Sequence, residues 1–231
     1  MADLPKLNVV LDLDETLVHA SIAGQATHHA LTQVNNNIPS TDETRKISAD
    51  TIEIRLRTEN EELVSVNRRP GLELFLEALG DFKLFAFTAS ESYYMNPLLD
   101  AIDPQKKYFG ERRFSRDVCT QIGDGRYTKD LSKIAMSELG EQAVVNDAWY
   151  ARTVLVDNNP FSFVPQPQNG IPVVSWYQNP EDVALSKVFQ FLQQLQPMND
   201  VRPFLDTTFH VEKTLNKFAE ANGKEVFQPY Y

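Results

Sequence analysis

The sequence is poor in cysteine, in long hydrophobic runs and in positive charge. Its single cysteine, Cys119, has no partner in the chain for an internal disulfide, so the fold does not depend on an oxidising compartment. The longest apolar runs, such as 84–87 and 153–156, fall far short of the roughly 20 residues that span a bilayer. We therefore predict an intracellular protein, cytoplasmic or nuclear, with no membrane segment in this chain; the sequence leaves open an anchor or targeting segment upstream.

The charge balance argues against a nucleic-acid partner. The 22 Lys and Arg residues face 32 Asp and Glu residues, which gives a net charge of −10 and a pI near 4.9. An acidic protein repels a phosphate backbone. Hydrophobic residues make up 42% of the 231-residue chain, as in ordinary globular proteins. With no internal repeat and no strong linker, the chain is predicted to form one domain over 1–231 with a core at about 7–205; the oligomeric state stays open.

Apolar strand patterns alternate with helical ones. Nearly continuous apolar stretches predict buried strands at 7–13, 83–87, 153–156 and 171–176. Alternating residues at 51–57 and 63–66 predict a hairpin with one solvated face. Helices are expected at 72–79, 91–101, 132–139, 181–195 and 207–222, and a long mobile loop at 24–50. The pattern predicts an α/β fold, a doubly wound and mainly parallel sheet covered on both faces, with a small β-hairpin insertion.

Polar side chains follow three of these strands where each strand ends. They are Asp12 and Asp14 after the first strand, Thr88 and Ser90 after the second, and Asp157, Asn158 and Asn159 after the third. The carboxyl ends of the strands in a doubly wound sheet form its ligand crevice, so these groups are expected to converge. Each motif alone is more typical of a turn or a helix cap. Their joint occurrence at three strand ends favours a functional site.

The acidic residues indicate a metal ion. Asp12 and Asp14 are two residues apart and can aim at the same cavity. Such partly buried carboxylates repel each other unless a cation compensates or one is protonated, and the addition of Asp157 favours the cation. Oxygen ligands without cysteine or clustered histidine select a hard ion, and Mg²⁺ is the natural candidate. Lys129 would supply a second positive charge aimed at a bound phosphate, or else is an ordinary surface lysine.

The motifs together resemble the haloacid dehalogenase superfamily, and within it the small C-terminal-domain phosphatases and their Dullard-type relatives. The resemblance covers roughly residues 7–205. It is carried by DLDETLVH (12–19), RRPGLELFLEAL (68–79), FTAS (87–90), RYTKDLS (126–132), VLVDNNP (154–160) and IPVVSWYQNPEDVAL (171–185). It implies a haloacid dehalogenase-like α/β fold and phosphatase activity.

The resemblance also implies roles for single residues. Asp12 would be the nucleophile that forms an aspartyl-phosphate, and Asp14 the general acid and then the general base. Thr88 would hydrogen-bond a phosphoryl oxygen, Ser90 beside it would contact the substrate, and Lys129 would neutralise the phosphate and steady Asp12.

Metal and peptide binding follow from the same resemblance. Mg²⁺ would be held by Asp12, the backbone carbonyl of Asp14 and Asn158, with Asp157 close by. Tyr94 and Arg116 match positions that receive the phosphorylated peptide in these relatives.

The segment between Lys129 and Asp157 is too short for a separate cap domain, since domains typically have about 50 residues or more. An open site follows, with room for a protein side chain.

Residues 106–133 include eight basic and four acidic residues, which predicts either a basic rim for an acidic phosphopeptide or a solvated surface. The leading hypothesis is a Mg²⁺-dependent protein serine/threonine phosphatase acting on a phosphorylated protein or peptide. The alternatives are a small-molecule phosphomonoesterase and a non-catalytic protein-binding module of the same fold.

Three further features have expected structural roles only. His19 is expected in a helix or turn of the first motif, and Cys119 has no neighbouring base that would make it a nucleophile. Residues 140–151 are expected to form an insertion.

Overall fold

The structure is a computed structural model of the 231-residue chain, and it describes residues 4–22, 50–56, 63–123 and 125–221. The loop expected at 24–50 lies outside the described residues except for Asp50. The same holds for Arg57 at the end of the expected hairpin strand and for Asn222 at the end of the expected last helix.

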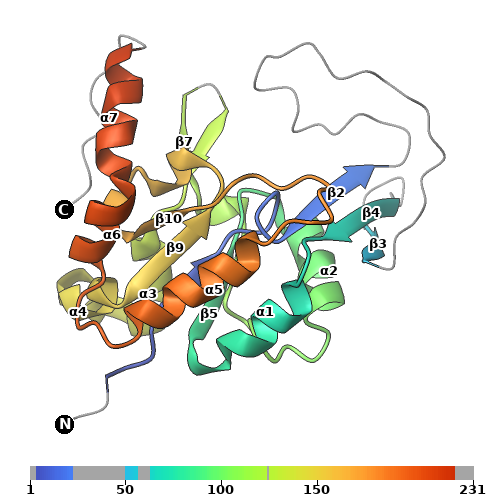
Figure 1. Cartoon of the computed structure of the whole chain (residues 1–231), viewed down its shortest axis with the longest axis horizontal. Helices are drawn as coiled ribbons and strands as arrows, with labels where there is room; N and C mark the ends of the chain where they lie inside the picture. Colours follow the sequence, from blue (N-terminus) through green and yellow to red (C-terminus); the bar gives the residue numbers. More distant parts are fainter. Residues whose placement is uncertain (1–3, 23–49, 57–62, 124, 222–231) are drawn as a thin grey trace.

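A five-stranded parallel sheet forms the centre of the fold (Figure 1). Its order is β10-β9-β1-β5-β6, and every neighbouring pair is parallel. The strands are β1 (Asn8–Leu11), β5 (Lys83–Phe87), β6 (Arg113–Phe114), β9 (Thr153–Asp157) and β10 (Gly170–Pro172). From β1 the chain builds β5 and β6 on one side and β9 and β10 on the other. The winding therefore reverses at β1, and this places the crevice at its carboxyl end.

Helices cover both faces of this sheet. They are α1 (Leu72–Ala78), α2 (Ser92–Ile102), α3 (Leu131–Leu139), α4 (Asp147–Ala151), α5 (Ala184–Leu195), α6 (Arg202–Phe209) and α7 (Val211–Ala221). Val9 and Leu11 of β1 pack into a core with α1, α2 and α5, whereas Val10 faces a second core with α3, α4 and α7. Burial on both faces explains the unbroken apolar run in the sequence. The predicted doubly wound α/β fold is confirmed.

A second, antiparallel sheet stands beside the central one. Its order is β2-β4-β3, with β2 at Val18–Ile22, β3 at Thr51–Arg55 and β4 at Leu63–Arg68. The predicted hairpin is present as β3 and β4, but the interpretation of His19 as part of a helix or turn is wrong because His19 lies in β2. That strand pairs with β4, about fifty residues away along the chain. A short hairpin of β7 (Thr120–Ile122) and β8 (Arg126–Thr128) was also not predicted.

Several element boundaries differ from prediction. The strand expected at 171–176 is limited to β10, and the last helix is divided into α6 and α7. The division falls at His210, which has a left-handed backbone with φ 50°. Val211 and Leu215 of α7 pack into the second core, so the core continues past residue 205. Residues 140–151 form the short helical turn η4 (Gly140–Val145) and α4, which lead directly into β9.

Short 3-10 turns connect several of these elements: η2 (Leu79–Asp81), η3 (Arg116–Val118), η5 (Pro160–Phe163) and η6 (Pro167–Asn169).

The carboxyl end of the central sheet is open. In the part of the chain that the structure describes, no large cap domain covers the strand ends (Figure 1). None of the described helices has the length and apolar character needed to cross a membrane.

Candidate active site

The loop after β1 brings Asp12 and Asp14 to the carboxyl end of the sheet. The carbonyl oxygen of Leu13 accepts hydrogen bonds from the backbone N–H groups of Leu17 (2.8 Å) and Val18 (3.0 Å), which folds the chain back toward β2. Glu15 has a left-handed backbone with φ 57°, which is uncommon for a residue with a side chain. The turn is therefore tight, and both carboxylates stay at the strand end.

Lys129 joins the ends of β1 and β9. Its Nζ donates hydrogen bonds to Oδ1 of Asp12 (2.5 Å) and to Oδ2 of Asp157 (2.7 Å). All three residues are buried, with 2%, 5% and 1% of their surface exposed for Lys129, Asp12 and Asp157. The alternative of a solvated surface lysine is therefore wrong for Lys129. Asp157 is held further by the backbone N–H of Asn159, which donates to its Oδ1 at 2.7 Å.

With both carboxylates ionised, this group carries one negative charge in excess, since two carboxylates then face one ammonium. Burial and the neighbouring carboxylate of Asp157 raise the pKa of Asp12 to about 8, against the opposing effect of Lys129. Burial lowers the pKa of Lys129, but Asp12 and Asp157 outweigh it and raise that pKa above its usual value. Lys129 therefore stays protonated, and full ionisation of Asp12 calls for additional positive charge.

Thr16 shows where that charge fits. Its hydroxyl donates to Oδ2 of Asp12 at 2.7 Å and lies 3.2 Å from Oδ1 of Asn158. One hydroxyl proton can serve only one of these acceptors, so two oxygens converge on a single small group. The amide of Asn158 is oriented by Ser175, whose Oγ accepts from its Nδ2 at 3.0 Å. This anionic, all-oxygen donor set fits a hard divalent cation such as Mg²⁺.

Asp14 belongs to a second group of polar side chains. Its Oδ2 accepts hydrogen bonds from Ser90 (2.7 Å) and Thr88 (3.2 Å), and its Oδ1 accepts from the hydroxyl of Tyr94 (2.7 Å). Burial and the Asp14 carboxylate raise the pKa of Tyr94 well above its usual value, so the phenol keeps its proton and donates. The carboxylate of Asp14 thus has hydrogen-bond partners different from those of Asp12 and Asp157. Among the described residues, no group of three or more His, Cys, Asp and Glu side chains suits a metal.

Arg116 lies at the edge of the Asp14 group and contacts neither carboxylate of the β1 loop. Its Nε donates to the carbonyl of Ala89 (2.5 Å), its Nη1 pairs with Glu91 (3.0 Å), and its guanidinium lies over the ring of Tyr127 at 5.1 Å. About 30% of its side chain is exposed. Arg116 is therefore placed beside the loop that carries Thr88 and Ser90.

The basic segment 106–133 is less positive than its composition indicates. Acidic partners pair with Lys106, Arg113, Arg116 and Lys129, and the partners of three of these four lie outside the segment. Tertiary contacts thus supply carboxylates to three of these four residues that a count along the segment leaves out.

The chain matches the family model described as "NLI interacting factor-like phosphatase" over residues 7–202. It belongs to this family. The match spans the central sheet and both groups of site residues, and it ends at the start of α6.

Curated proteins named as phosphatases are similar along most of this chain. A Drosophila melanogaster protein named CTD nuclear envelope phosphatase 1 homolog is 33% identical over 208 residues, which are 89% of this chain and 74% of that protein. The Dictyostelium discoideum CTD small phosphatase-like protein 2 is also 33% identical, over 92% of this chain but only 31% of its own length. The chain thus spans about a third of some curated relatives.

A solved structure supports the fold. The structure titled "The Structure of Fcp1, an essential RNA polymerase II CTD phosphatase" matches with a TM-score of 0.50 and 17% identity, covering 98% of this chain and 58% of that one. At this identity the likeness concerns the fold alone.

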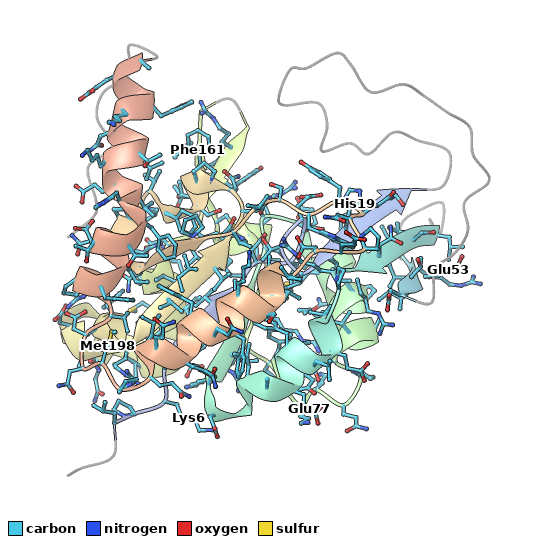
Figure 2. All side chains as sticks on the ribbon, in the orientation of Figure 1. Lys6, His19, Glu53, Glu77, Phe161 and Met198 are labelled. Atoms are coloured by element: carbon cyan, nitrogen blue, oxygen red, sulfur yellow. The ribbon has the colours of Figure 1, made fainter. Side chains whose placement is uncertain are left out.

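Sequence reasoning assigned no role to three residues that the structure connects to the site. Thr16 stands inside the DLDET motif, so its spacing from Asp12 was a usable signal. Ser175 contacts Asn158 from a distant loop, and Arg69 holds the loop carbonyls; neither contact has a sequence signal. His19, which is labelled in Figure 2, lies on β2. Its ring packs edge-on against that of Tyr177, with ring centroids 5.3 Å apart.

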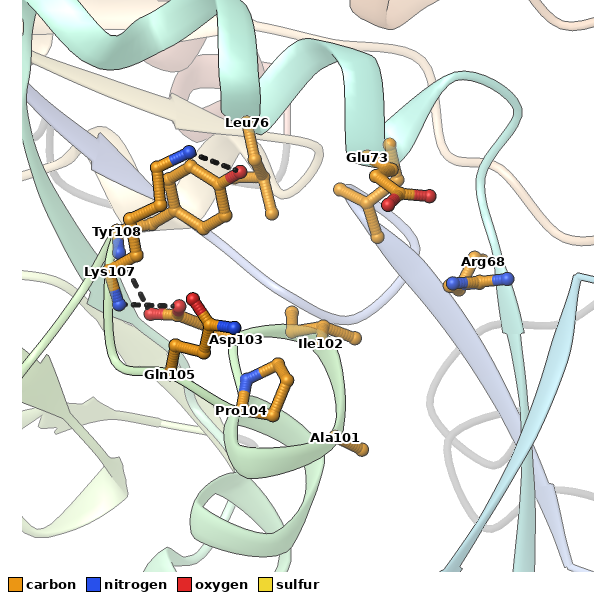
Figure 3. Close-up of a pocket in the computed structure, with 11 residues that line it drawn as sticks. Arg68, Glu73, Leu76, Ala101, Ile102, Asp103, Pro104, Gln105, Lys107 and Tyr108 are labelled. Carbon is orange, nitrogen blue, oxygen red and sulfur yellow. Dashed lines mark hydrogen bonds between the residues drawn. The ribbon is translucent and has the colours of Figure 1, made fainter.

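Two other features lie outside the site chemistry. Burial raises the pKa of Cys119 to about 11, so its thiolate is scarce at neutral pH, in agreement with the sequence interpretation. A cavity of about 350 Å³ lies between α1 and the end of α2 (Figure 3), and none of the predicted site residues lines it. Its buried Asp103 accepts three backbone N–H groups and needs no ligand.

Proposed function

We propose that this chain is a Mg²⁺-dependent protein serine/threonine phosphatase that works through an aspartyl-phosphate. The observation that carries the proposal is the buried bridge of Lys129 between Asp12 and Asp157, with Asp14 held separately two residues along the same loop. One carboxylate is thereby available as a nucleophile beside positive charge, and the other as an acid and base.

Asp12 performs the first bond change. One of its carboxylate oxygens attacks phosphorus, and the bond from phosphorus to the seryl or threonyl oxygen breaks. Lys129 neutralises charge on the transferring phosphoryl group and keeps Asp12 in place. Asp14 gives its proton to the departing oxygen, so the product is a neutral alcohol and Asp14 becomes a carboxylate.

Asp14 then takes a proton from water. The resulting hydroxide attacks the phosphorus of the aspartyl-phosphate, inorganic phosphate leaves and the Asp12 carboxylate is restored. Hydrogen bonds from the hydroxyl groups of Ser90, Thr88 and Tyr94 fix the position of the Asp14 carboxylate for this step.

Mg²⁺ would be held by Asp12, Asn158 and the backbone carbonyl of Asp14, with Asp157 close by. When bound, it supplies positive charge that offsets the negative charge of the carboxylates, so that an anionic substrate can approach, and it polarises a phosphoryl oxygen. Thr16 and Ser175 orient the side chains of Asp12 and Asn158.

The protein substrate is proposed from the open strand ends and from the names of relatives. The human relative, 32% identical over 86% of this chain, is named carboxy-terminal domain RNA polymerase II polypeptide A small phosphatase 1. Together with the Drosophila protein named for the nuclear envelope, it supports a phosphorylated protein or peptide as substrate and a nuclear or cytoplasmic location. No nucleic-acid partner is proposed, in keeping with the acidic charge.

A substrate panel tests this function. Phosphoserine and phosphothreonine peptides should be hydrolysed faster than sugar or nucleotide phosphates, and excess chelator should abolish turnover until Mg²⁺ is restored. Faster turnover of the small metabolites would favour a small-molecule phosphomonoesterase, and binding of phosphopeptide without turnover would favour a non-catalytic module. Full activity in excess chelator would contradict the metal requirement.

Arg116 tests the peptide side of the proposal. Arg116→Ala should lower phosphopeptide turnover about tenfold, while turnover of a small aryl phosphate should change less than about twofold. The reason is that Arg116 contacts Ala89 and Glu91 and not the carboxylates of Asp12 and Asp14. The exposed Lys133 of the same basic segment provides the control, Lys133→Ala. Equal losses on both substrates would place Arg116 at the phosphoryl group.

A further inference from the structure

Arg69 has a fully buried side chain, with 1% of the residue exposed. Its Nε and Nη2 form a bidentate pair with the two carboxylate oxygens of Asp182, at 2.8 and 2.9 Å. Its Nη1 donates to the carbonyl of Thr16 and its Nη2 to the carbonyl of Val174, both at 3.0 Å. One guanidinium thus ties together three segments that are far apart in the sequence: the β1 loop, the loop after β10 and the residues before α5.

Each loop that Arg69 holds also orients an expected metal ligand. In the β1 loop, the hydroxyl of Thr16 donates to Oδ2 of Asp12. In the loop after β10, the residue next to the held carbonyl is Ser175, whose Oγ accepts from the amide of Asn158. The positions of Asp12 and Asn158 relative to each other therefore depend on two carbonyls that share one guanidinium.

We propose that Arg69, anchored by Asp182, is a positioning residue that sets the divalent-cation affinity of the site. It acts through the backbone of the two loops and contacts neither substrate nor cation. The inference rests on the proposed phosphatase function, because the cation in question is the Mg²⁺ proposed for that function. Residues that orient metal ligands from behind typically change metal affinity by about 10- to 100-fold when mutated.

The chemistry of arginine is required at this position. Its planar fork satisfies a carboxylate and two carbonyls at once, whereas the ammonium of lysine is a compact point charge on a flexible stem. Arg69→Lys therefore keeps the charge beside Asp182 but cannot hold both loops. Asp182→Asn keeps the shape of the anchor and leaves the buried guanidinium without a counter-charge.

Arg152 is a matched control from the same protein. It is also buried, with 5% exposed, and its guanidinium likewise bonds backbone carbonyls, those of Leu195, Gln196, Met198 and Pro5. These carbonyls belong to the opposite end of α5 and to the N-terminal segment. Arg152→Lys should therefore lower stability without acting on the metal ligands.

The experiment measures metal binding directly. Mn²⁺, a paramagnetic substitute for Mg²⁺, is titrated into the wild-type protein and the variants, and the free ion is followed by electron paramagnetic resonance. Thermal unfolding in chelator is measured on the same samples, together with aryl phosphate turnover against Mg²⁺ concentration.

Arg69→Lys should raise the Kd for Mn²⁺ and the half-saturating Mg²⁺ concentration about tenfold or more, with the KM for aryl phosphate at saturating Mg²⁺ within about twofold of wild type. Arg152→Lys should lower the Tm and leave the Kd within about twofold. If Arg69→Lys does not fold, Asp182→Asn should raise the Kd in the same direction.

An unchanged Kd in a folded Arg69→Lys or Asp182→Asn protein would overturn the inference, as would an equal rise in Kd for Arg152→Lys. Failure of the proposed function would give a different result. A wild-type protein that binds Mn²⁺ but hydrolyses no phosphate ester would contradict the proposed phosphatase activity. The comparison of Kd values would still decide the role of Arg69.

Discussion

The hydroxyl of Tyr94 donates a 2.7 Å hydrogen bond to Oδ1 of Asp14. The resemblance assigned Tyr94 to peptide binding, but in the structure this phenol, on α2, contacts the carboxylate proposed as general acid and base. Removing only the hydroxyl should therefore loosen Asp14 without changing the backbone.

Tyr94→Phe should lower kcat/KM for a phosphoserine peptide about tenfold, which corresponds to about 1.4 kcal/mol of lost transition-state stabilisation. An aryl phosphate has a better leaving group and depends less on protonation, so its turnover should fall less. The neighbouring Tyr93, of which 52% is exposed, gives the control Tyr93→Phe. An equal effect of both substitutions would argue against a role of Tyr94 at Asp14.

The two carboxylates of the first motif should be separable by trapping the phosphoenzyme. Asp12→Asn removes the attacking oxygen, so activity should fall to background and no phosphate should be bound covalently. Asp14→Asn keeps the nucleophile but removes the base of the second step, so phosphoenzyme should accumulate with an aryl phosphate. Rapid acid quench followed by intact mass analysis measures both. Phosphate on the Asp12→Asn protein, or on another residue of the wild type, would contradict the assignment.

Lys129 should matter for stability as well as for turnover. Lys129→Met leaves two buried carboxylates without their shared ammonium, which should cost about 3–5 kcal/mol of unfolding free energy and reduce activity at least 100-fold. Mg²⁺ should raise the Tm of this variant more than that of the wild type, since it supplies the missing charge. The exposed Lys133 gives the control Lys133→Met, and identical responses to Mg²⁺ in both variants would speak against the charge argument.

The pair of Arg69 and Asp182 predicts a pH dependence of stability. The hydrogen bond from Arg69 lowers the pKa of Asp182 below the ordinary value of 3.8, against the effect of burial. An acid with a depressed folded-state pKa stabilises the fold above its unfolded pKa, and this contribution is lost as the pH falls through the folded value. Asp182→Asn should therefore cost about 2 kcal/mol at pH 7, and the difference from wild type should shrink below about pH 4. Denaturant unfolding from pH 7 to pH 3 measures it; a constant difference would exclude ionisation as the cause.

Much of the fold follows from local patterns. The apolar strands at 83–87 and 153–156, the hairpin and the helices at 72–79 and 132–139 lie close to their expected positions, because burial of a strand or of one helix face dictates residue type at a regular spacing. Strand β2 could not be predicted from a local pattern, because Val18–Ile22 becomes a strand by pairing with β4. The division of the last helix likewise depends on how α7 packs into the second core.

The sequence by itself determined which side chains stand at the strand ends and in what order, because parallel strands bring their carboxyl ends to one edge of a sheet. It therefore indicated Asp12, Asp14, Thr88 and Asp157 as neighbours. Only the tertiary structure decided which side chains contact each of these carboxylates. Lys129 joins Asp12 to Asp157, whereas Tyr94 and Ser90 bind Asp14. These contacts, like those of Arg69, link residues dozens of positions apart, and the direction of a side chain across such a distance is set by packing of whole elements and not by local spacing.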